Sequence, residues 1–119
     1  MTPTLNLFVY GTLRSGQFRN DVLGNSKLVG TGITNGVLYD LGPFPGAKFS
    51  GKKSLTGDVY EINQETLSTL DFIESNGYLF ERKIVHVLVN NEYRECWAYE
   101  FLPNVKEEMI VKTGDYLNQ

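Results

Sequence analysis

A carboxylate lies on the apolar stripe of the one segment of this sequence that has a helical period. The segment from Gln64 to Glu74 carries Leu67, Leu70 and Glu74 at i, i+3 and i+7. At about 100° per residue, this spacing places Glu74 in angle between the two leucines. If the stripe faces the core, desolvation and the negative end of the helix both raise the pKa of Glu74. Because a general acid or base needs a pKa near the working pH, Glu74 is a candidate catalytic residue.

Two other environments for Glu74 are compatible with the same spacing. Its side chain can turn to solvent, or it can pair with Arg82 or Lys83. Asp71, three residues earlier, raises the pKa of Glu74 further if it faces the same stripe. Alternatively, Asp71 lies at the rim of the stripe and hydrogen-bonds to the backbone.

The second candidate feature is the segment Phe8 to Gly16, in which a buried strand ends at a glycine. Gly11 lets the backbone bend, or lets a ligand approach its amides closely. Successive N–H groups in such a turn can hold a carboxylate or a developing oxyanion. The glycine spacing is that of a P-loop, but Gln17 and Phe18 stand where Lys and Ser or Thr are required. The alternative is a glycine at an ordinary strand-to-loop turn.

The elements that must position these residues are mostly strands. Strands are expected over 5–10, 36–40 and 55–62, with a Pro- and Gly-rich loop over 41–46 and a hairpin of 82–89 and 93–101 around Asn90-Asn91-Glu92. The helix has Asn63 as its N-cap, and Gly77 stops it. We therefore expect the α+β class, with an antiparallel or mixed sheet that curls toward a barrel and one main helix packed against it.

Length and composition limit the possible functions. The 119 residues suit a single domain over 1–119, and 14 acidic against 11 basic residues give a net charge of −3, which disfavours nucleic acid as a partner. The N-terminus, Met1-Thr2-Pro3, does not resemble a signal peptide, and no membrane span is expected. One Cys cannot form an internal disulfide, so a reducing cytoplasm is the expected compartment. One Cys and one His are also too few for a typical zinc site, so no metal is expected.

Several short motifs follow one another along nearly the whole chain. They are Val9-Tyr10-Gly11-Thr12-Leu13-Arg14-Ser15-Gly16, Leu38-Tyr39-Asp40-Leu41-Gly42, Gly57-Asp58-Val59-Tyr60, Leu70-Asp71-Phe72-Ile73-Glu74, Arg82 and Gly114-Asp115. On these motifs the sequence resembles the γ-glutamylcyclotransferase-like superfamily, in particular its small AIG2-like and γ-glutamylamine cyclotransferase branch. The pairing of a Tyr-Gly-Thr-Leu segment with an LDxxE helix is fairly specific to that superfamily.

The resemblance implies a small mixed β-barrel with one main helix and a cavity between the first loop and the helix. It also implies an enzyme that releases 5-oxoproline and a free amine or amino acid from a γ-glutamyl compound, without metal or cofactor. The loop motif of the family falls on Tyr10, Gly11, Thr12 and Leu13, which would hold the γ-glutamyl group. The acid/base glutamate of the family falls on Glu74.

The sequence departs from the family pattern at four places. Ser75 stands where glycine is frequent, Phe80 where tyrosine is frequent, and Tyr116 where tryptophan is frequent. Asn20 resembles the asparagine that commonly follows the loop, but the spacing is one residue longer, so it is left out of the expected site.

The implied chemistry needs no nucleophile from the protein. The α-amine of a γ-glutamyl group can attack its own side-chain carbonyl, so the protein must fold the substrate back, move a proton and stabilise the carbonyl oxygen. We assign the proton transfers to Glu74 and the binding of substrate oxygens, carboxylate or carbonyl, to the amides of Gly11 to Leu13. Arg82 is a further substrate-binding candidate, as the partner of a carboxylate, or equally a strand arginine on a solvated face.

Other functions remain compatible with the sequence. The same fold can serve as a non-catalytic binding domain for a small metabolite, which Phe80 favours and Glu74 disfavours. An exposed aromatic patch would instead indicate a protein-interaction domain. His86, on a strand face with Ile84 and Leu88, is expected to be structural, and Cys96 is expected to be a small packing residue. The particular substrate and the oligomeric state do not follow from the sequence.

Overall fold

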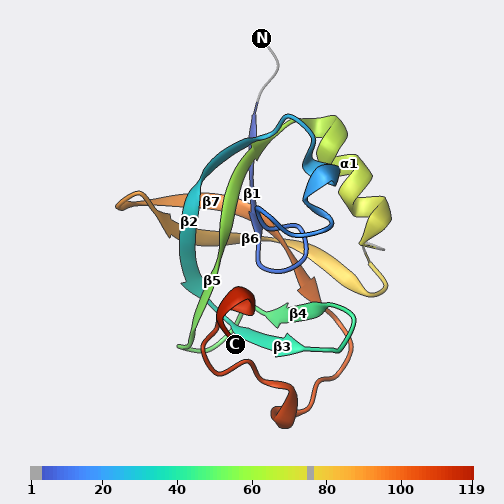
Figure 1. Cartoon of the computed structure of the whole chain (residues 1–119), viewed down its shortest axis with the longest axis vertical. Coiled ribbons are helices and arrows are strands. Elements are labelled where there is room, and N and C mark those ends of the chain that lie inside the picture. The colour runs from blue at the N-terminus through green and yellow to red at the C-terminus, as the bar shows by residue number, and fades with distance from the viewer. Residues whose placement is uncertain (1–3, 75–76) are drawn as a thin grey trace.

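A closed five-stranded barrel forms the centre of the computed structural model, which describes residues 4–74 and 77–119 (Figure 1). The strands around the barrel are β1 (Leu5–Val9), β5 (Ser54–Ile62), β2 (Lys27–Asn35), β6 (Phe80–Val89) and β7 (Glu92–Phe101). All neighbours are antiparallel except β1 and β7, which are parallel. The expected small mixed barrel of the α+β class is confirmed. The N-terminal residues Met1–Pro3 and the departure at Ser75 lie outside the described residues.

Strand β1 is apolar except for Asn6, and both faces of its second half are covered. Phe8 and, just after the strand, Tyr10 belong to the core inside the barrel. Leu7 and Val9 point the other way, into a second core between the barrel and the helix. The strand therefore connects the two cores, and the loop that follows it emerges where they meet.

The only α-helix in the described part of the chain, α1 (Gln64–Ile73), packs against the outside of the barrel. Leu67 and Leu70 are buried in the second core, as the period predicted. Asn63 is the N-cap and accepts a hydrogen bond from the Thr66 amide at 2.8 Å. The helix ends one residue earlier than expected, so that Glu74 is its C-cap. None of the helices in residues 4–74 and 77–119 has the length and apolar character needed to cross a bilayer.

The N-cap gives a small, separate test of this helix. Asn63→Ala should lower the free energy of unfolding by about 1 kcal/mol, because the Thr66 amide loses its acceptor. Asn63→Ser keeps a capping oxygen and should stay close to the wild type. Urea unfolding followed by circular dichroism measures both, and equal stabilities for the two variants would contradict the capping role.

The hairpin of β6 and β7 turns at Asn90 and Asn91, whose φ angles are 52° and 64°. Two left-handed residues are typical of the tight turn that asparagine favours in two-residue hairpins. The strands begin at Phe80 and Glu92, slightly earlier than expected. On β7, Tyr99 lies in the second core, whereas Cys96 lies inside the barrel. Cys96 is therefore a packing residue, as predicted.

Two strands differ from the expectation. β2 was not predicted, because its alternation is interrupted by Gly30 and Gly32; it forms through its long pairing with β5. The expected loop over 41–46 is wrong at its end, where β4 (Pro45–Lys48) pairs with β3 (Val37–Asp40) in a separate two-stranded ribbon. Proline is compatible with the first position of a strand, which is where Pro45 lies.

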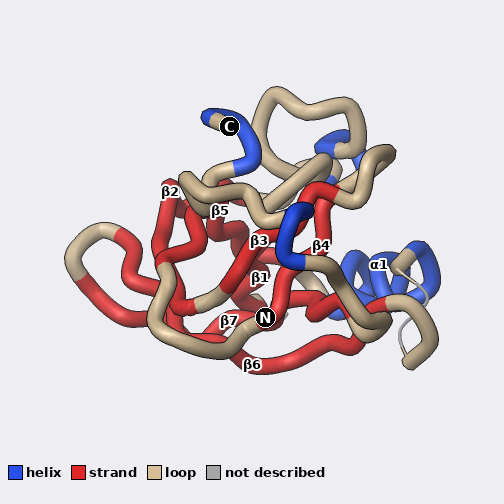
Figure 2. Tube along the Cα trace, turned by 90° about the horizontal axis from the view of Figure 1, so that it is seen from below, coloured by secondary structure: helices blue, strands red, loops and turns tan. Residues whose placement is uncertain are grey.

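The C-terminal segment closes one end of the barrel. It contains two short 3₁₀ turns, η2 (Glu107–Met109) and η3 (Tyr116–Asn118). A third such turn, η1 (Asn20–Leu23), lies between β1 and β2. The Val111 amide donates to Leu38 O, and the Thr56 amide donates to Gly114 O, both at 2.8 Å. Figures 1 and 2 show this segment beside β3 and the adjoining end of β5. These two hydrogen bonds tie β3 and β5 to residues 111–114, far along the chain.

Candidate active site

A small cavity that opens to solvent lies where the end of α1 approaches the loop after β1. Its lining residues come from β1 and its loop, from the turn before η1, from the start of β4, from the end of α1, and from β6 and β7. They are Phe8, Val9, Tyr10, Gly11, Thr12, Leu13, Arg19, Phe44, Pro45, Glu74, Phe80 and Tyr99. Four of the five expected substrate-binding residues and the expected catalytic glutamate therefore border one cavity.

Glu74 is nearly buried in this cavity wall, with 9% of its surface exposed. Its amide donates to Leu70 O at 2.8 Å, which continues the last turn of the helix and holds the residue on the buried face. Burial raises the pKa of the carboxyl above its ordinary value, and the nearby Arg19 partly opposes this rise. Of the environments left open by the spacing, the structure shows the inward one. The ion pair of Glu74 is with Arg19 at 3.3 Å, and not with Arg82 or Lys83.

Asp71 has its own partners. It accepts a hydrogen bond from the Tyr99 hydroxyl at 2.6 Å, and the Arg82 Nε lies 3.1 Å from the same carboxylate. The Arg82 guanidinium also stacks over Trp97, 4.2 Å from the ring centroid. Arg82 is absent from the cavity lining. The ion pair with Asp71 fastens β6 to α1, and the assignment of Arg82 to substrate binding remains a prediction.

The loop after β1 brings unpaired amides to the cavity. The Arg14 amide donates to Gly11 O at 3.0 Å, which closes a tight turn. The amides of Gly11, Thr12 and Leu13 donate no hydrogen bond to another described residue. These three residues line the cavity together with the buried Glu74, and neighbouring free N–H groups of this kind suit an oxyanion or a carboxylate ligand.

Gly11 is required by packing. Its φ is not positive, but a Cβ atom built at this position would lie 2.3 Å from Pro45 Cγ. Any larger residue would push the start of β4 away from the loop. The sequence suggested two roles for Gly11, a bend in the backbone or the close approach of a ligand. The contact with Pro45 is a third role, which the sequence did not indicate.

The Tyr10 hydroxyl is part of the scaffold. It donates to Tyr99 O at 2.7 Å and accepts from the Ala47 amide at 3.2 Å, so it connects β7 to β4. Burial raises the pKa of Tyr10 and keeps the hydroxyl protonated. The ring of Tyr10 borders the cavity, while its polar atom is used by the backbone.

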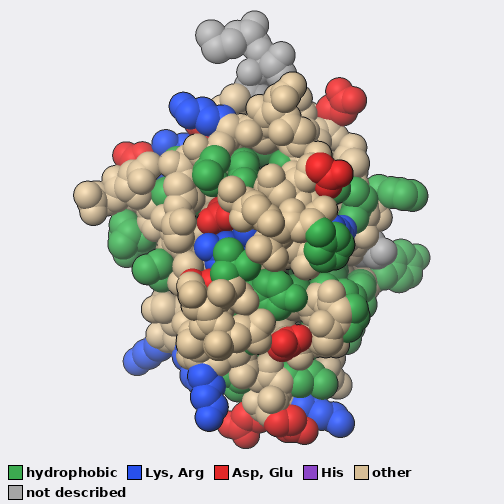
Figure 3. Space-filling view, viewed as in Figure 1, with side chains coloured by type: hydrophobic (Ala, Val, Ile, Leu, Met, Phe, Trp, Pro, Cys, Tyr) green, Lys and Arg blue, Asp and Glu red, His purple; other side chains and the backbone are tan. Residues whose placement is uncertain are grey.

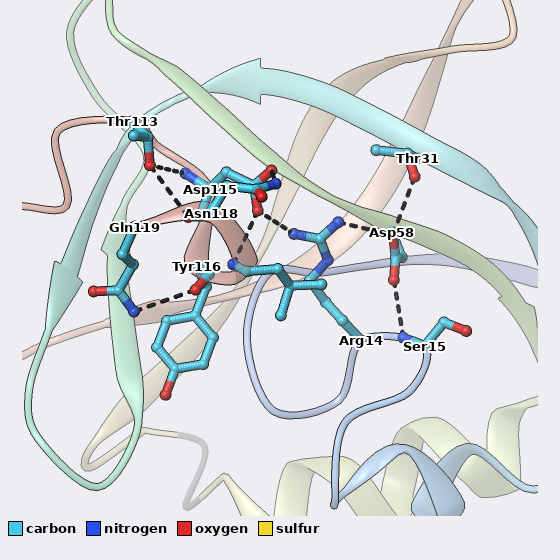
Figure 4. A network of polar contacts seen from close by, with 10 residues as sticks. Arg14, Ser15, Thr31, Asp58, Thr113, Asp115, Tyr116, Asn118 and Gln119 are labelled. Carbon is cyan, nitrogen blue, oxygen red and sulfur yellow. Dashed lines mark hydrogen bonds and ion pairs between the residues drawn. The ribbon is translucent and has the colours of Figure 1, made fainter.

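The same loop is anchored from behind by a buried ion cluster (Figure 4). Arg14 Nη1 lies 2.8 Å from Asp115 and Arg14 Nη2 lies 3.3 Å from Asp58. Asp58 also accepts from the Ser15 amide at 2.9 Å. Arg14 and Asp58 are 5% and 4% exposed. The cluster ties the loop to β5 and to the C-terminal segment.

Asn20 supports the loop from the other side. Its Nδ2 donates to Leu13 O at 2.8 Å and to the Tyr60 hydroxyl at 3.0 Å. Asn20 does not line the cavity.

Sequence reasoning missed several residues of the cavity. Arg19, Phe44, Pro45 and Tyr99 line it. The Pro-Phe-Pro segment signalled only a loop, and Arg19 lies in an irregular turn that has no periodic pattern. Phe80, noted as a departure from the family pattern, also borders the cavity and contributes an apolar wall where a tyrosine would bring a hydroxyl.

The cysteine and the histidine of the chain lie away from the cavity. Cys96 is inside the barrel, where burial raises the pKa of its thiol to about 11. His86 is exposed on β6. Among residues 4–74 and 77–119 there is no group of three His, Cys, Asp or Glu side chains that could hold a metal ion. Glu74 and Arg19 are the only charged residues that line the cavity in the described chain.

Large hydrophobic side chains project on the side of the molecule that carries α1 (Figure 3). Phe72 and Tyr78 are both 87% exposed. An exposed aromatic surface is therefore present, as the interaction-domain alternative requires. The cavity beside Glu74, which that alternative does not require, favours a small-molecule site.

The buried carboxyl predicts a pH-dependent stability difference. Because the pKa of Glu74 is raised in the fold, the stabilising contribution of its protonated form is present below its ordinary value of 4.5 and is lost as pH rises through the folded-state pKa. Glu74→Gln, which removes the buried charge, should therefore exceed the wild type in free energy of unfolding at neutral pH. This advantage should shrink as the pH falls through the folded-state pKa toward 4.5, and it should be constant below 4.5.

Urea unfolding at a series of pH values measures this difference. Glu65→Gln, at an exposed position on the first turn of the same helix, is the matched control and should show no such trend. A Glu74→Gln advantage that is constant with pH would mean that desolvation of the ionised carboxyl is not its cause.

A closed barrel with a helix packed on its outside is an architecture that is also found in solved structures. The structure of a mouse AIG2-like protein superposes with a TM-score of 0.82, covering 95% of this chain and 88% of that one at 24% identity, which shows a common fold. The solution structure of YtfP from Escherichia coli superposes with a TM-score of 0.72, covering 96% of this chain and 97% of that one at 31% identity.

The sequence comparisons identify the family. The γ-glutamylcyclotransferase family protein YtfP of E. coli K12 is 33% identical over 116 residues, which cover 97% of this chain and 98% of YtfP. The model of the γ-glutamyl cyclotransferase, AIG2-like family matches residues 7–118. The chain therefore belongs to the γ-glutamyl cyclotransferase, AIG2-like family, as its motifs predicted.

Proposed function

We propose that this protein is a γ-glutamyl cyclotransferase that releases 5-oxoproline and a free amine or amino acid from a γ-glutamyl compound. The observation that carries this proposal is the buried Glu74 carboxyl in one wall of the cavity, with the unpaired amides of Gly11 to Leu13 in another. This pair of features supplies a proton acceptor and oxygen-binding donors, which are the groups that an intramolecular aminolysis needs.

In the proposed reaction the α-nitrogen of the substrate attacks its own γ-carbonyl carbon. A carbon–nitrogen bond forms within the new five-membered lactam, and the bond from that carbon to the departing amine breaks. Glu74 accepts a proton from the α-ammonium and returns it to the departing nitrogen. The second proton lost by the ammonium is balanced by protonation of the released amine in water.

The reaction asks little else of the protein. Nucleophile and leaving group both belong to the substrate, so the proposed step uses neither a metal nor a cofactor. The cavity would hold the substrate folded back, with its α-nitrogen near the carbonyl carbon. The raised pKa of Glu74 favours the protonated form that a general acid needs after the first transfer.

The proposal is tested by incubating the purified protein with glutathione, with a γ-glutamyl amino acid and with γ-glutamyl-lysine. Mass spectrometry should detect 5-oxoproline from one of the three, and the compound that reacts identifies the departing amine. Release of 5-oxoproline from none of them would favour the alternative, a non-catalytic metabolite-binding domain, which the apolar Phe80 in the cavity wall also suits.

A further inference from the structure

Arg19 brings a positive charge to the cavity that the proposed chemistry does not use. Its guanidinium lies 3.3 Å from Glu74 Oε1, and its side chain is 28% exposed. Glu74 and Arg19 therefore present one negative and one positive group side by side, in a wall whose other described residues are uncharged.

The backbone places Arg19 firmly beside the loop. The Arg19 amide donates to Thr12 O at 3.0 Å, and the next residue, Asn20, donates to Leu13 O at 2.8 Å. Gly16, at φ 84°, provides the turn that brings the chain back. The guanidinium thus comes from a segment held against the same amides that border the cavity.

Most N–H groups of the Arg19 guanidinium form no hydrogen bond with the described residues. Of its five N–H groups, the structure engages only Nη2 among the described residues, in one contact with Glu74. A bidentate pair would use two parallel hydrogen bonds and would hold both side chains more tightly. Arg19 can therefore bind a carboxylate that enters the cavity.

The γ-glutamyl group carries charges that match this pair. Its α-ammonium and its α-carboxylate are attached to the same carbon, so they must bind to neighbouring groups of the protein. If the α-ammonium contacts Glu74, as the proposed proton transfer requires, the α-carboxylate lies next to it, where the Arg19 guanidinium is. We propose that Arg19 binds the α-carboxylate, and that Arg19 and Glu74 together recognise the α-amino acid end of the γ-glutamyl group.

This inference rests on the proposed function and makes it more specific. With the α-carboxylate on Arg19, the amides of Gly11 to Leu13 are left for the γ-carbonyl oxygen, on which negative charge develops. The substrate class becomes γ-glutamyl compounds with a free α-carboxylate. Amides of 4-aminobutanoic acid, which have hydrogen in place of that carboxylate, would be poor substrates.

The decisive experiment compares two small rings that differ only in the carboxylate. Calorimetry measures the binding of 5-oxoproline and of 2-pyrrolidinone to the wild type and to Arg19→Met. The wild type should prefer 5-oxoproline, and Arg19→Met should lose about 10- to 100-fold in affinity for it, the range expected for a charged hydrogen-bonded contact. The affinity for 2-pyrrolidinone should stay unchanged.

Two further variants serve as controls. Arg19→Lys keeps the charge and should retain part of the preference for 5-oxoproline. Arg94→Met removes an arginine of the same exposure, 28%, that pairs with Glu61 and Glu92 on the barrel. It should bind 5-oxoproline as the wild type does.

The outcomes separate this inference from the proposed function. An Arg19→Met variant that keeps the wild-type preference for 5-oxoproline would overturn the inference, even if the wild type turns over γ-glutamyl compounds. A wild type that binds neither ring would also overturn it. A wild type that binds 5-oxoproline through Arg19 but turns over no γ-glutamyl compound would support the inference and refute the cyclotransferase activity.

Discussion

Replacing Glu74 by glutamine should lower the turnover of a γ-glutamyl substrate by about 10²- to 10⁴-fold, the contribution typical of one positioned proton transfer. Glutamine has nearly the same shape and fills the same space at the end of α1, so the cavity should persist. It cannot accept the α-ammonium proton or return it to the departing amine. The loss should therefore appear in kcat, with much smaller changes in ligand binding.

Steady-state release of 5-oxoproline, measured for the wild type and for Glu74→Gln, checks this prediction. Calorimetry with 5-oxoproline shows whether the variant still binds ligand. Glu65→Gln makes the same chemical change at an exposed position of the same helix and should keep wild-type turnover. If Glu74→Gln retained wild-type kcat, the acid/base role of Glu74 would be wrong, even with the cavity intact.

Arg14→Met should lower the free energy of unfolding by about 3–5 kcal/mol, the range for removing one partner of a buried ion pair. The variant leaves Asp58 buried and negatively charged, with only the hydrogen bonds from the Ser15 amide and the Thr31 hydroxyl to compensate. It also frees Asp115, and with it the C-terminal segment, from the loop that carries the unpaired amides.

Urea unfolding measures this loss. Arg94→Met removes two partly exposed ion pairs, with Glu61 and Glu92, and should cost about 1 kcal/mol or less. The double variant Arg14→Met/Asp58→Asn removes the orphaned charge as well and should recover part of the loss, since the two residues are in direct contact. An Arg14→Met variant as stable as Arg94→Met would show that the cluster contributes little.

Such a loss would also affect the site. The loop of Gly11 to Leu13 is held by Arg14 on one side and by Asn20 on the other. A change of 1 Å in the position of its amides is enough to weaken stabilisation of the carbonyl oxygen. At a temperature where both proteins are fully folded, Arg14→Met should therefore also have a lower kcat than the wild type.

The sequence alone determined the features that depend on short-range patterns. Periodicity predicts that β1 is covered on both faces and that the helix carries Leu67 and Leu70 on one face. Local backbone preferences predict the turn at Asn90 and Asn91. The same periodicity placed Glu74 in angle between the two leucines, but it left open whether the side chain turns inward or to solvent.

The tertiary structure decided which partners meet. Arg14 contacts Asp58 and Asp115, 44 and 101 residues away in the chain, and Glu74 meets Arg19 across 55 residues. Pro45 lies against Gly11 only because β4 packs beside the loop after β1. No local pattern encodes such pairs, because they depend on how the barrel closes. The sequence thus marked Glu74 as the carboxylate on the apolar stripe, whereas the tertiary structure determined that it turns inward and that Arg19 lies beside it.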